Sequence, residues 1–429
     1  MRIIPADAYK IERNVDYGTR EQNEAVQKII QDVATGGDAA LLKYTAEFDK
    51  MTLTASDLRV TEEEVQAAYR EVDEEFLTAI RLAASNIRGF HEKQKRTSWI
   101  DTAEDGTILG QIMRPIKRVG LYVPGGTAAY PSTVLMNVIP AKVAGVSEIV
   151  MVTPPATAGK AGINPSILVA AAEAGVTEIY RVGGAQAIAA LAYGTETIPA
   201  VDKICGPGNI YVALAKRYVY GSVDIDSIAG PTDIVVLADE TADPEYVAAD
   251  LLSQAEHDVM SSAILVTDSL ALAEAVSAEV DRQLSVLPRR EIAAAAIAKS
   301  AILTVGSLME GVHTVNRIAP EHLEVIVREP ISVLPHIENA GAIFLGPYST
   351  EPVGDYFAGP NHVLPTNGTA RFSSPLNIDD FVKKSSIIQY SKDALLRDAT
   401  HIMKLARAEG FEGHARAVEI RVKKEGNSQ

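Results

Sequence analysis

The most constraining feature of this chain is a regular alternation of short apolar segments with longer amphipathic ones, running from about residue 118 to residue 346. The short segments, such as EIVMV (148–152) and IVVLA (234–238), are almost continuously apolar. Strands of this kind are buried on both faces, as in parallel sheets whose strands are connected by helices. The alternation therefore predicts an α/β fold.

The alternation falls into two series of similar size, which predicts two parallel-sheet domains rather than one very large sheet. The first series has strands at 118–123, 147–153, 177–182 and 201–205, with helices at 131–145, 164–175, 185–193 and 208–220. The second has strands at 233–238, 262–267, 301–305, 322–328 and 342–346, with helices at 242–257, 269–285 and 289–299. Neither contains the GxGxxG fingerprint, so both are Rossmann-like only in an incomplete sense.

Helical spacing dominates the first hundred residues and returns after residue 378, with one expected strand at 385–390. We therefore expect small helical segments at both ends of the chain. The predicted parts are an N-terminal segment (1–18), a first α/β domain (19–115 with 230–377), a second α/β domain (116–229) and a C-terminal helical segment (378–429).

Composition excludes several classes of function. The chain has 40 Lys and Arg against 56 Asp and Glu, and a net charge of −16 argues against a broad nucleic-acid surface. No apolar stretch approaches the roughly 20 residues that a membrane span needs. The N-terminus lacks the apolar region of a signal peptide, so we expect a cytoplasmic protein. The single cysteine, Cys205, excludes a disulfide framework and a thiolate metal cluster.

A metal site without thiolates must use imidazole, carboxylate or amide groups, and several histidines stand beside such groups. Gln254 and His257 are three residues apart at a helix end, on one side of its last turn, and could share a ligand. A polar helix end is the commoner explanation of such a pair.

Two further segments carry candidate residues. Glu321 and His322 open an apolar strand, at the mouth of a buried strand where α/β sheets place ligands, and they could serve acid–base chemistry. The stretch 351–366 has little helix or strand propensity and contains Asp355 and His362. A long irregular loop in a compact domain is often functional.

The remaining signals are weaker. His414 opens the final predicted helix, where a lone histidine is ordinary, and Gly206-Pro207-Gly208-Asn209 precedes a helix, where it could approach a phosphate or serve only as a turn and helix cap. There is no P-loop, no HExxH and no GxSxG motif. The patterns alone support an α/β protein with a possible His/Asp/Gln metal site.

Taken together, five long strings in this order resemble the histidinol dehydrogenase family along essentially the whole chain. They are VGLYVPGGTAAYPSTVLMN (119–137), VGGAQAIAALAYGTETIPAVDKICGPGN (182–209), DLLSQAEHD (250–258), APEHLE (319–324) and GPNHVLPT (359–366).

The resemblance implies an NAD-dependent oxidation of L-histidinol to L-histidine through bound L-histidinal, the final step of histidine biosynthesis. It implies one zinc ion per subunit, held by residues that correspond to Gln254, His257, Asp355 and His414. The zinc would position the substrate rather than activate water. His322 corresponds to the general base, and Glu321 to the carboxylate that activates water for the second oxidation.

The zinc ligands and His322 also surround the family's substrate, and the other substrate contacts correspond to Thr232, His362 and Glu409. The NAD contacts correspond to Tyr122, Gln186 and Asn209. The first α/β domain would then carry the metal and catalytic residues, and the second would face NAD. Family members often have Ser and Glu at the positions of Thr232 and Asp233, so this chain keeps a hydroxyl and a carboxylate there.

The family is a homodimer whose C-terminal segment completes the active site of the partner, so Glu409 and His414 would act in the other subunit. Apart from that second copy we expect only a small-molecule substrate as partner, with no nucleic acid and no membrane.

Three alternatives remain open. A paralogue could oxidise another polar alcohol, a zinc hydrolase could use the same ligands to hold an attacking water, and a silent metal-binding protein would show no turnover.

Overall fold

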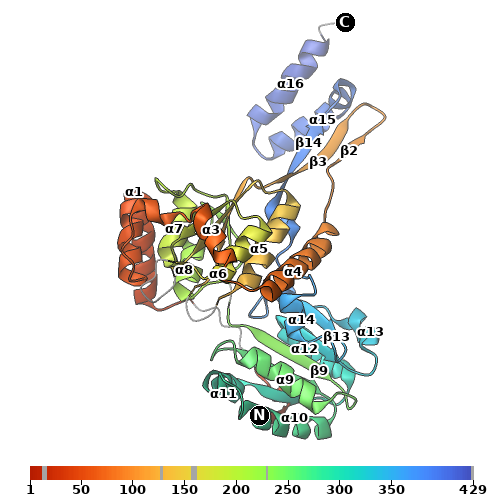
Figure 1. Ribbon diagram of the computed structural model, residues 1–429. Coiled ribbons are helices and arrows are strands. Elements are labelled where there is room, and N and C mark those ends of the chain that lie inside the picture. Colours follow the sequence, from red (N-terminus) through yellow and green to blue (C-terminus); the bar gives the residue numbers. More distant parts are fainter. Residues whose placement is uncertain (12–16, 126–128, 156–161, 229, 427–429) are drawn as a thin grey trace. The chain divides into compact units, whose positions relative to one another are not determined.

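The computed structural model describes residues 1–11, 17–125, 129–155, 162–228 and 230–426. Residues 126–128 of the first glycine-rich string lie outside these ranges. The chain divides into two compact units, Met1–Gln94 with Ile116–Phe381, and Lys95–Pro115 with Val382–Gln429. The first unit holds two parallel sheets and the second an antiparallel one, which confirms the predicted α/β class (Figure 1).

The smaller parallel sheet has the strand order β6-β5-β4-β7-β8. Its strands are β4 (Arg118–Tyr122), β5 (Glu148–Thr153), β6 (Glu178–Arg181), β7 (Lys203–Cys205) and β8 (Asp224–Ile225). The helices between them are α5 (Pro131–Ala144), α6 (Pro165–Ala174), α7 (Gly184–Tyr193) and α8 (Ile210–Val219). Because the chain leaves β4 toward β5 and later returns to its other side with β7, β4 and β7 border a topological switch point.

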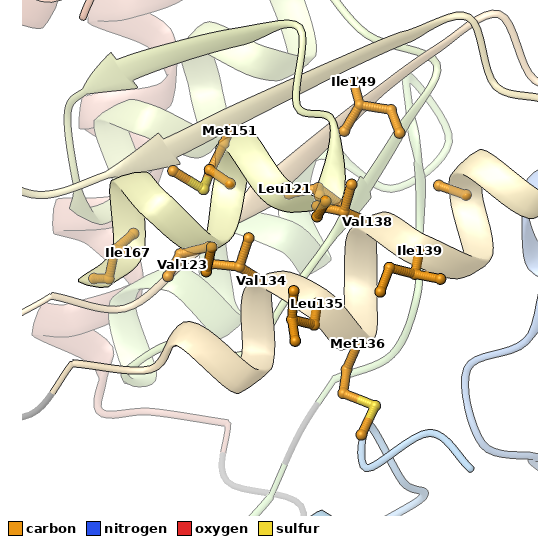
Figure 2. Packing of buried hydrophobic residues seen from close by; sticks show 14 of the residues in the cluster. Leu121, Val123, Val134, Leu135, Met136, Val138, Ile139, Ile149, Met151 and Ile167 are labelled. Carbon is orange, nitrogen blue, oxygen red and sulfur yellow. The ribbon is translucent and has the colours of Figure 1, made fainter. Parts of the chain in front are cut away.

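Successive residues of β5 enter two different cores. Ile149 and Met151 pack with α5 and α6 (Figure 2), whereas Val150 and Val152 face α7 and α8. Burial on both faces explains why the strand is apolar throughout.

The N-terminal helices cover the smaller sheet. They are α1 (Arg20–Phe48), α2 (Ala55–Leu58), α3 (Glu62–Tyr69) and α4 (Glu74–Glu92). α1 packs against α7 and α8, α3 against α6, and α4 against α5. These helices therefore lie with the strands of 116–229, whereas we had grouped 19–115 with 230–377. The boundaries of independently folding domains stay a prediction.

The larger sheet is parallel throughout, with the order β1-β11-β10-β9-β12-β13. Its strands are β1 (Arg2–Pro5), β9 (Asp233–Ala238), β10 (Ser262–Thr267), β11 (Ala301–Thr304), β12 (His322–Ile326) and β13 (Ala342–Leu345). α9 (Pro244–Ala255), α10 (Leu270–Leu284) and α11 (Arg290–Lys299) cover one face, and α12 (Leu308–Ile318) and α13 (Pro330–Val333) the other.

Two expectations need correction here. The N-terminal segment, expected to be helical, contributes the edge strand β1, whose four residues are too few to show a period. The stretch 351–366 is not irregular throughout, because Glu351–Tyr356 forms helix α14, with Pro352 in its first turn, where proline is favoured.

The second unit combines a three-stranded sheet with two helices. β3 (Ile108–Pro115) lies between β2 (Trp99–Thr102) and β14 (Val382–Gln389). α15 (Lys392–Ala408) and α16 (Glu412–Gly426) follow. Short 3₁₀ turns elsewhere in the chain are Ala6–Ala8, Leu334–His336, Thr369–Arg371 and Ile378–Phe381. None of the helices in the described ranges is long and apolar enough to cross a membrane.

Candidate active site

A cavity of about 490 Å³ in the first unit brings most of the candidate residues together. The residues that follow strands of the smaller sheet line it at Gly206–Asn209, and those around the larger sheet line it at Thr232, His257, Glu321, His322, Glu351, Asp355 and His362. Side chains from segments more than 150 residues apart in sequence therefore share one space.

The larger sheet presents the amino ends of its strands to this cavity. Asp233 begins β9 and His322 begins β12, and the two strands are paired neighbours. In α/β sheets, ligands usually bind at the carboxyl ends of the strands. The expectation that Glu321 and His322 lie at that end is therefore wrong. α9 and α12 run back from the opposite edge and end here, which is why polar residues gather at this edge. We call the set Asp233, Gln254, His257, Glu321, His322, Glu351 and Asp355 the acidic edge.

Glu321 and His322 are held by the residues that lead into β9. The Glu321 carboxylate accepts from the Thr232 hydroxyl at 2.6 Å and from the Asp233 amide at 3.1 Å. His322 Nδ1 lies 3.0 Å from the Asp233 carbonyl oxygen and donates to it. Among the described residues, the buried Nε2 of His322 has no hydrogen-bond partner, and Asp355 Oδ1 lies 3.7 Å from it.

The acidic edge perturbs the pKa values of its own members. Burial raises the pKa of Glu321 to about 7. Burial alone would lower the pKa of His322, but the negative charges of Glu321, Asp355 and Glu351 outweigh it and raise that pKa to about 10. Without a ligand, the imidazolium is the positive charge that these carboxylates require. The edge as a whole favours a cation.

Gln254, His257, Glu351 and Asp355 surround one point of this edge. Ligand atoms of His257, Glu351 and Asp355 all lie within 4.8 Å of one another. With its amide nitrogen turned toward Glu351, Gln254 donates to the two Glu351 oxygens at 2.9 and 3.1 Å, and its oxygen then lies against the Thr232 hydroxyl. His257 Nε2 lies 3.7 Å from Glu351 Oε1. The donors are nitrogen and oxygen, as a zinc site without cysteine requires.

Glu351 is the residue that the sequence reasoning missed. It is buried, it accepts from the Ser253 hydroxyl at 2.9 Å, and its backbone amide donates to Glu324 at 2.8 Å. In α14 it stands one helical turn before Asp355, so both carboxylates lie on one face. The spacing Glu-x-x-x-Asp would have indicated this, had the segment been recognised as helical.

His362 follows α14 in the irregular remainder of the loop. Its Nδ1 lies 3.0 Å from the backbone carbonyl oxygen of Asp355 and donates to it. This hydrogen bond leaves Nε2 as the acceptor of the ring.

The smaller sheet presents the carboxyl ends of its strands, followed by glycines and helix N-termini. We call the set Tyr122, Gly184, Gln186 and Gly206–Asn209 the glycine edge. The Tyr122 hydroxyl accepts from the Gly184 amide at 3.2 Å, and both side-chain polar atoms of the buried Gln186 lack a partner among the described residues. Asn209 caps α8, accepting from Tyr211 and Val212.

Gly206 is required where the glycine edge is tightest. Its φ is +112°, and a Cβ there would overlap the Tyr122 carbonyl oxygen. Its amide donates to Asp226 at 2.7 Å, and its carbonyl accepts from Lys216 at 2.9 Å. Lys216 and Asp226 form an ion pair whose side chains are 3% and 4% exposed. A buried charge pair thus fixes both backbone groups of this glycine.

Two candidate residues lie in the second unit. Glu409 is the C-cap of α15, and His414 stands in the first turn of α16 against the ring of Phe411. Both are exposed. Their part in a site remains a prediction.

Comparison with known proteins places the chain in one family. The model of the family "Histidinol dehydrogenase" matches residues 13–422. The histidinol dehydrogenases of Halalkalibacterium halodurans and Bacillus subtilis are 64% and 60% identical to it, over 99% and 98% of this chain and 100% and 97% of theirs. The crystal structure of histidinol dehydrogenase from Elizabethkingia anophelis superposes with a TM-score of 0.92 at 42% identity, covering 97% of this chain and 95% of that one. The chain belongs to the histidinol dehydrogenase family of oxidoreductases.

Proposed function

We propose that this protein oxidises L-histidinol to L-histidine in two NAD-dependent steps at a zinc-containing site. The observation that carries the proposal is the buried His322 Nε2, which lacks a partner among the described residues and faces the cavity between carboxylates. A buried imidazole costs free energy unless something pairs with it, so a ligand is expected there. Family membership supports the identity of that ligand.

The acidic edge fits a zinc ion. His257 and Asp355, with Gln254 beside them, offer the nitrogen and oxygen donors that zinc accepts, and the surplus of carboxylates favours a cation. We assign the fourth position to His414 of a second subunit. Glu351 holds the Gln254 amide and faces His257, so it orients two of these ligands.

The glycine edge fits a dinucleotide. Gln186 has two polar atoms without a partner among the described residues, Gly206 lets its loop pass against the Tyr122 backbone, and α8 begins at this edge. Tyr122, Gln186 and Asn209 are the residues that we assign to NAD. Bound zinc supplies positive charge for holding the substrate amine and imidazole, and NAD supplies the hydride acceptor.

His322 takes the proton from the substrate hydroxyl while hydride leaves the adjacent carbon, which yields the aldehyde. A bound cation would replace the positive charge of the imidazolium, and the Nδ1 bond to the Asp233 carbonyl then keeps Nε2 as the proton-accepting nitrogen. The same base serves the second hydride transfer.

Glu321 acts between the two oxidations by taking a proton from the water that adds to the aldehyde, while His322 returns its proton to the aldehyde oxygen and becomes a base again. The carboxylate is buried, and Thr232 and Asp233 fix one of its oxygens. The hydrate then loses its hydroxyl proton to His322 and its hydride to the second NAD, and the acid is released. His362 and Glu409, the latter from a second subunit, are assigned to contacts with the substrate.

The first test is the amount of NADH formed per limiting L-histidinol, with zinc-loaded protein and excess NAD. Two equivalents with L-histidine as product are expected. One equivalent of NADH would limit the protein to the first oxidation. If L-histidinol gave no NADH but another alcohol did, the protein would instead be a paralogue that oxidises that alcohol.

Sharing of sites between subunits has a separate test. His322→Asn and His414→Asn proteins, each inactive alone, should recover activity when their subunits are exchanged, because one composite site then has both residues. No recovery after verified exchange would contradict the assignment of His414 to a second subunit. A cytoplasmic location stays a prediction.

A further inference from the structure

The buried helix α5 contains an internal proline that leaves one backbone carbonyl without its helical partner. Pro140 has no N–H, so it cannot bond to the carbonyl of Met136, four residues earlier. Met136 is fully buried, and an unpaired carbonyl there would cost free energy. The side chain of Asn361 fills this place, because its amide nitrogen donates to the Met136 oxygen at 2.6 Å.

The other polar groups of Asn361 are also occupied. Its amide nitrogen lies 3.4 Å from Nε2 of His91 on α4, and its oxygen accepts from the Val363 amide at 2.9 Å. His91 is buried and pairs through Nδ1 with Gln94 at 2.8 Å, which leaves Nε2 as the acceptor for Asn361. Asn361 is 4% exposed. Through these hydrogen bonds it joins α4 and α5 to its own loop.

The bond from Val363 to the Asn361 oxygen spans two residues and forms an Asx turn. The central residue of this turn is His362, which lines the cavity. The backbone of His362 is thus fixed by Asn361, and its ring by the Asp355 carbonyl.

We infer that Asn361 is a positioning residue for substrate recognition, which acts through His362 and uses the carbonyl that Pro140 leaves free. The inference rests on the function proposed above. Asn361 does not touch the reacting atoms, so its removal should weaken the binding of substrate more than the chemical steps.

A double-mutant cycle tests whether Asn361 acts through His362. Asn361→Ala should raise the KM for L-histidinol about tenfold, with the KM for NAD and the zinc content changed less than twofold. In a His362→Ala background, the same substitution should raise the KM less than twofold further. If the two substitutions raise the KM independently, so that their effects multiply in the double variant, the inference is overturned. An unchanged KM in Asn361→Ala would overturn it as well. No turnover by the unmodified protein would instead contradict the proposed function.

A second variant separates positioning from stability. Pro140→Ala supplies the N–H that Met136 lacks, so in Asn361→Ala protein it should restore the lost thermal stability but not the KM. Recovery of both together would show that Asn361 is only structural. Asn316 is the matched control, because it also bonds a loop carbonyl (His336) and a loop amide (Glu338) from a helix, outside the cavity lining. Asn316→Ala should leave the KM unchanged.

Discussion

Members of the acidic edge and of the glycine edge line the same cavity, but the two edges belong to opposite ends of their sheets. The glycine edge follows the carboxyl ends of its strands and carries the N-terminus of α8, whereas the acidic edge precedes β9 and β12 and receives the C-terminal ends of α9 and α12. Helix N-termini expose N–H groups and favour anions, and helix C-termini expose carbonyls and favour cations.

The difference shows how one supersecondary motif can serve two kinds of ligand. Parallel sheets built from the same β-α-β connections offer a site for a phosphate at one edge and for a metal or an ammonium group at the other. The polar residues follow this division, with glycines at one edge and carboxylates at the other.

The largest effect is expected at the acidic edge. His322→Asn should lower kcat about 10²- to 10⁴-fold, because it removes a general base without removing a proposed zinc ligand. Zinc content, measured by elemental analysis, should be unchanged. Loss of zinc would contradict the division of roles. His313→Asn, an exposed histidine of α12 outside the cavity lining, is the control and should be fully active.

At the glycine edge, the largest expected effect is on the stability of the fold. Lys216→Met breaks the buried ion pair and leaves Asp226 without its partner, which should lower the free energy of unfolding by about 3–5 kcal/mol. Urea unfolding measures this loss. The double variant Lys216→Met/Asp226→Leu should regain part of it. A single-variant loss below about 1 kcal/mol would show that Gly206 is held by other contacts.

Asn209 tests whether the glycine edge binds a ligand or only caps a helix. Asn209→Ala should cost about 1 kcal/mol, the usual value of an N-cap. Asn209→Asp keeps the cap and should unfold like the original protein, but its negative charge should raise the KM for NAD. Equal KM values for the two proteins would leave Asn209 with the capping role alone.

The smallest effect concerns two buried histidines with opposite shifts. Burial lowers the pKa of His91, and the hydrogen bond to Gln94 opposes this shift only in part. The carboxylates of the acidic edge instead raise the pKa of His322. The unfolded chain protonates His91 below about pH 6.5 and the folded chain resists it. Because protonation of His91 stabilises the unfolded chain, the free energy of unfolding should fall as the pH is lowered from about 7.

The measurement is the free energy of unfolding between pH 7.5 and 5.5 for the original protein and for His91→Gln, which keeps a polar side chain. The variant should show a shallower decrease over this range. Parallel curves would mean that His91 titrates alike in the folded and unfolded states.

The sequence was most informative where burial dictates residue type. Strands 233–238 and 262–267 were predicted at their observed bounds, because both faces of each are covered and polar residues are excluded from them. β1 was missed because an edge strand of four residues has no measurable period. Glu351 was missed because α14 is a single short helix whose proline and glycine hide it.

The site was predictable only through whole strings. Taken one at a time, the residues Gln254, His257 and Asp355 are ordinary polar residues. They come close together because α9 and α14 both lie at one edge of the sheet, and no local sequence pattern reveals this. Likewise, the pairing of Gly206 with Lys216 and Asp226 depends on tertiary structure. The resemblance to a family supplied what spacing could not.

The edge strand β1 has a consequence for the order of folding. It pairs in parallel with β11, and the amino group of Met1 bonds to Ser277, so this sheet unites residues some 300 positions apart. Closing so long a loop is slow, because the chain between β1 and β11 must lose its conformational entropy before the pairing of the strands can stabilise the sheet. During synthesis β1 must therefore wait until β11 has left the ribosome, and an exposed strand that waits is open to wrong partners. The larger sheet, which carries the acidic edge, is therefore completed only late in synthesis.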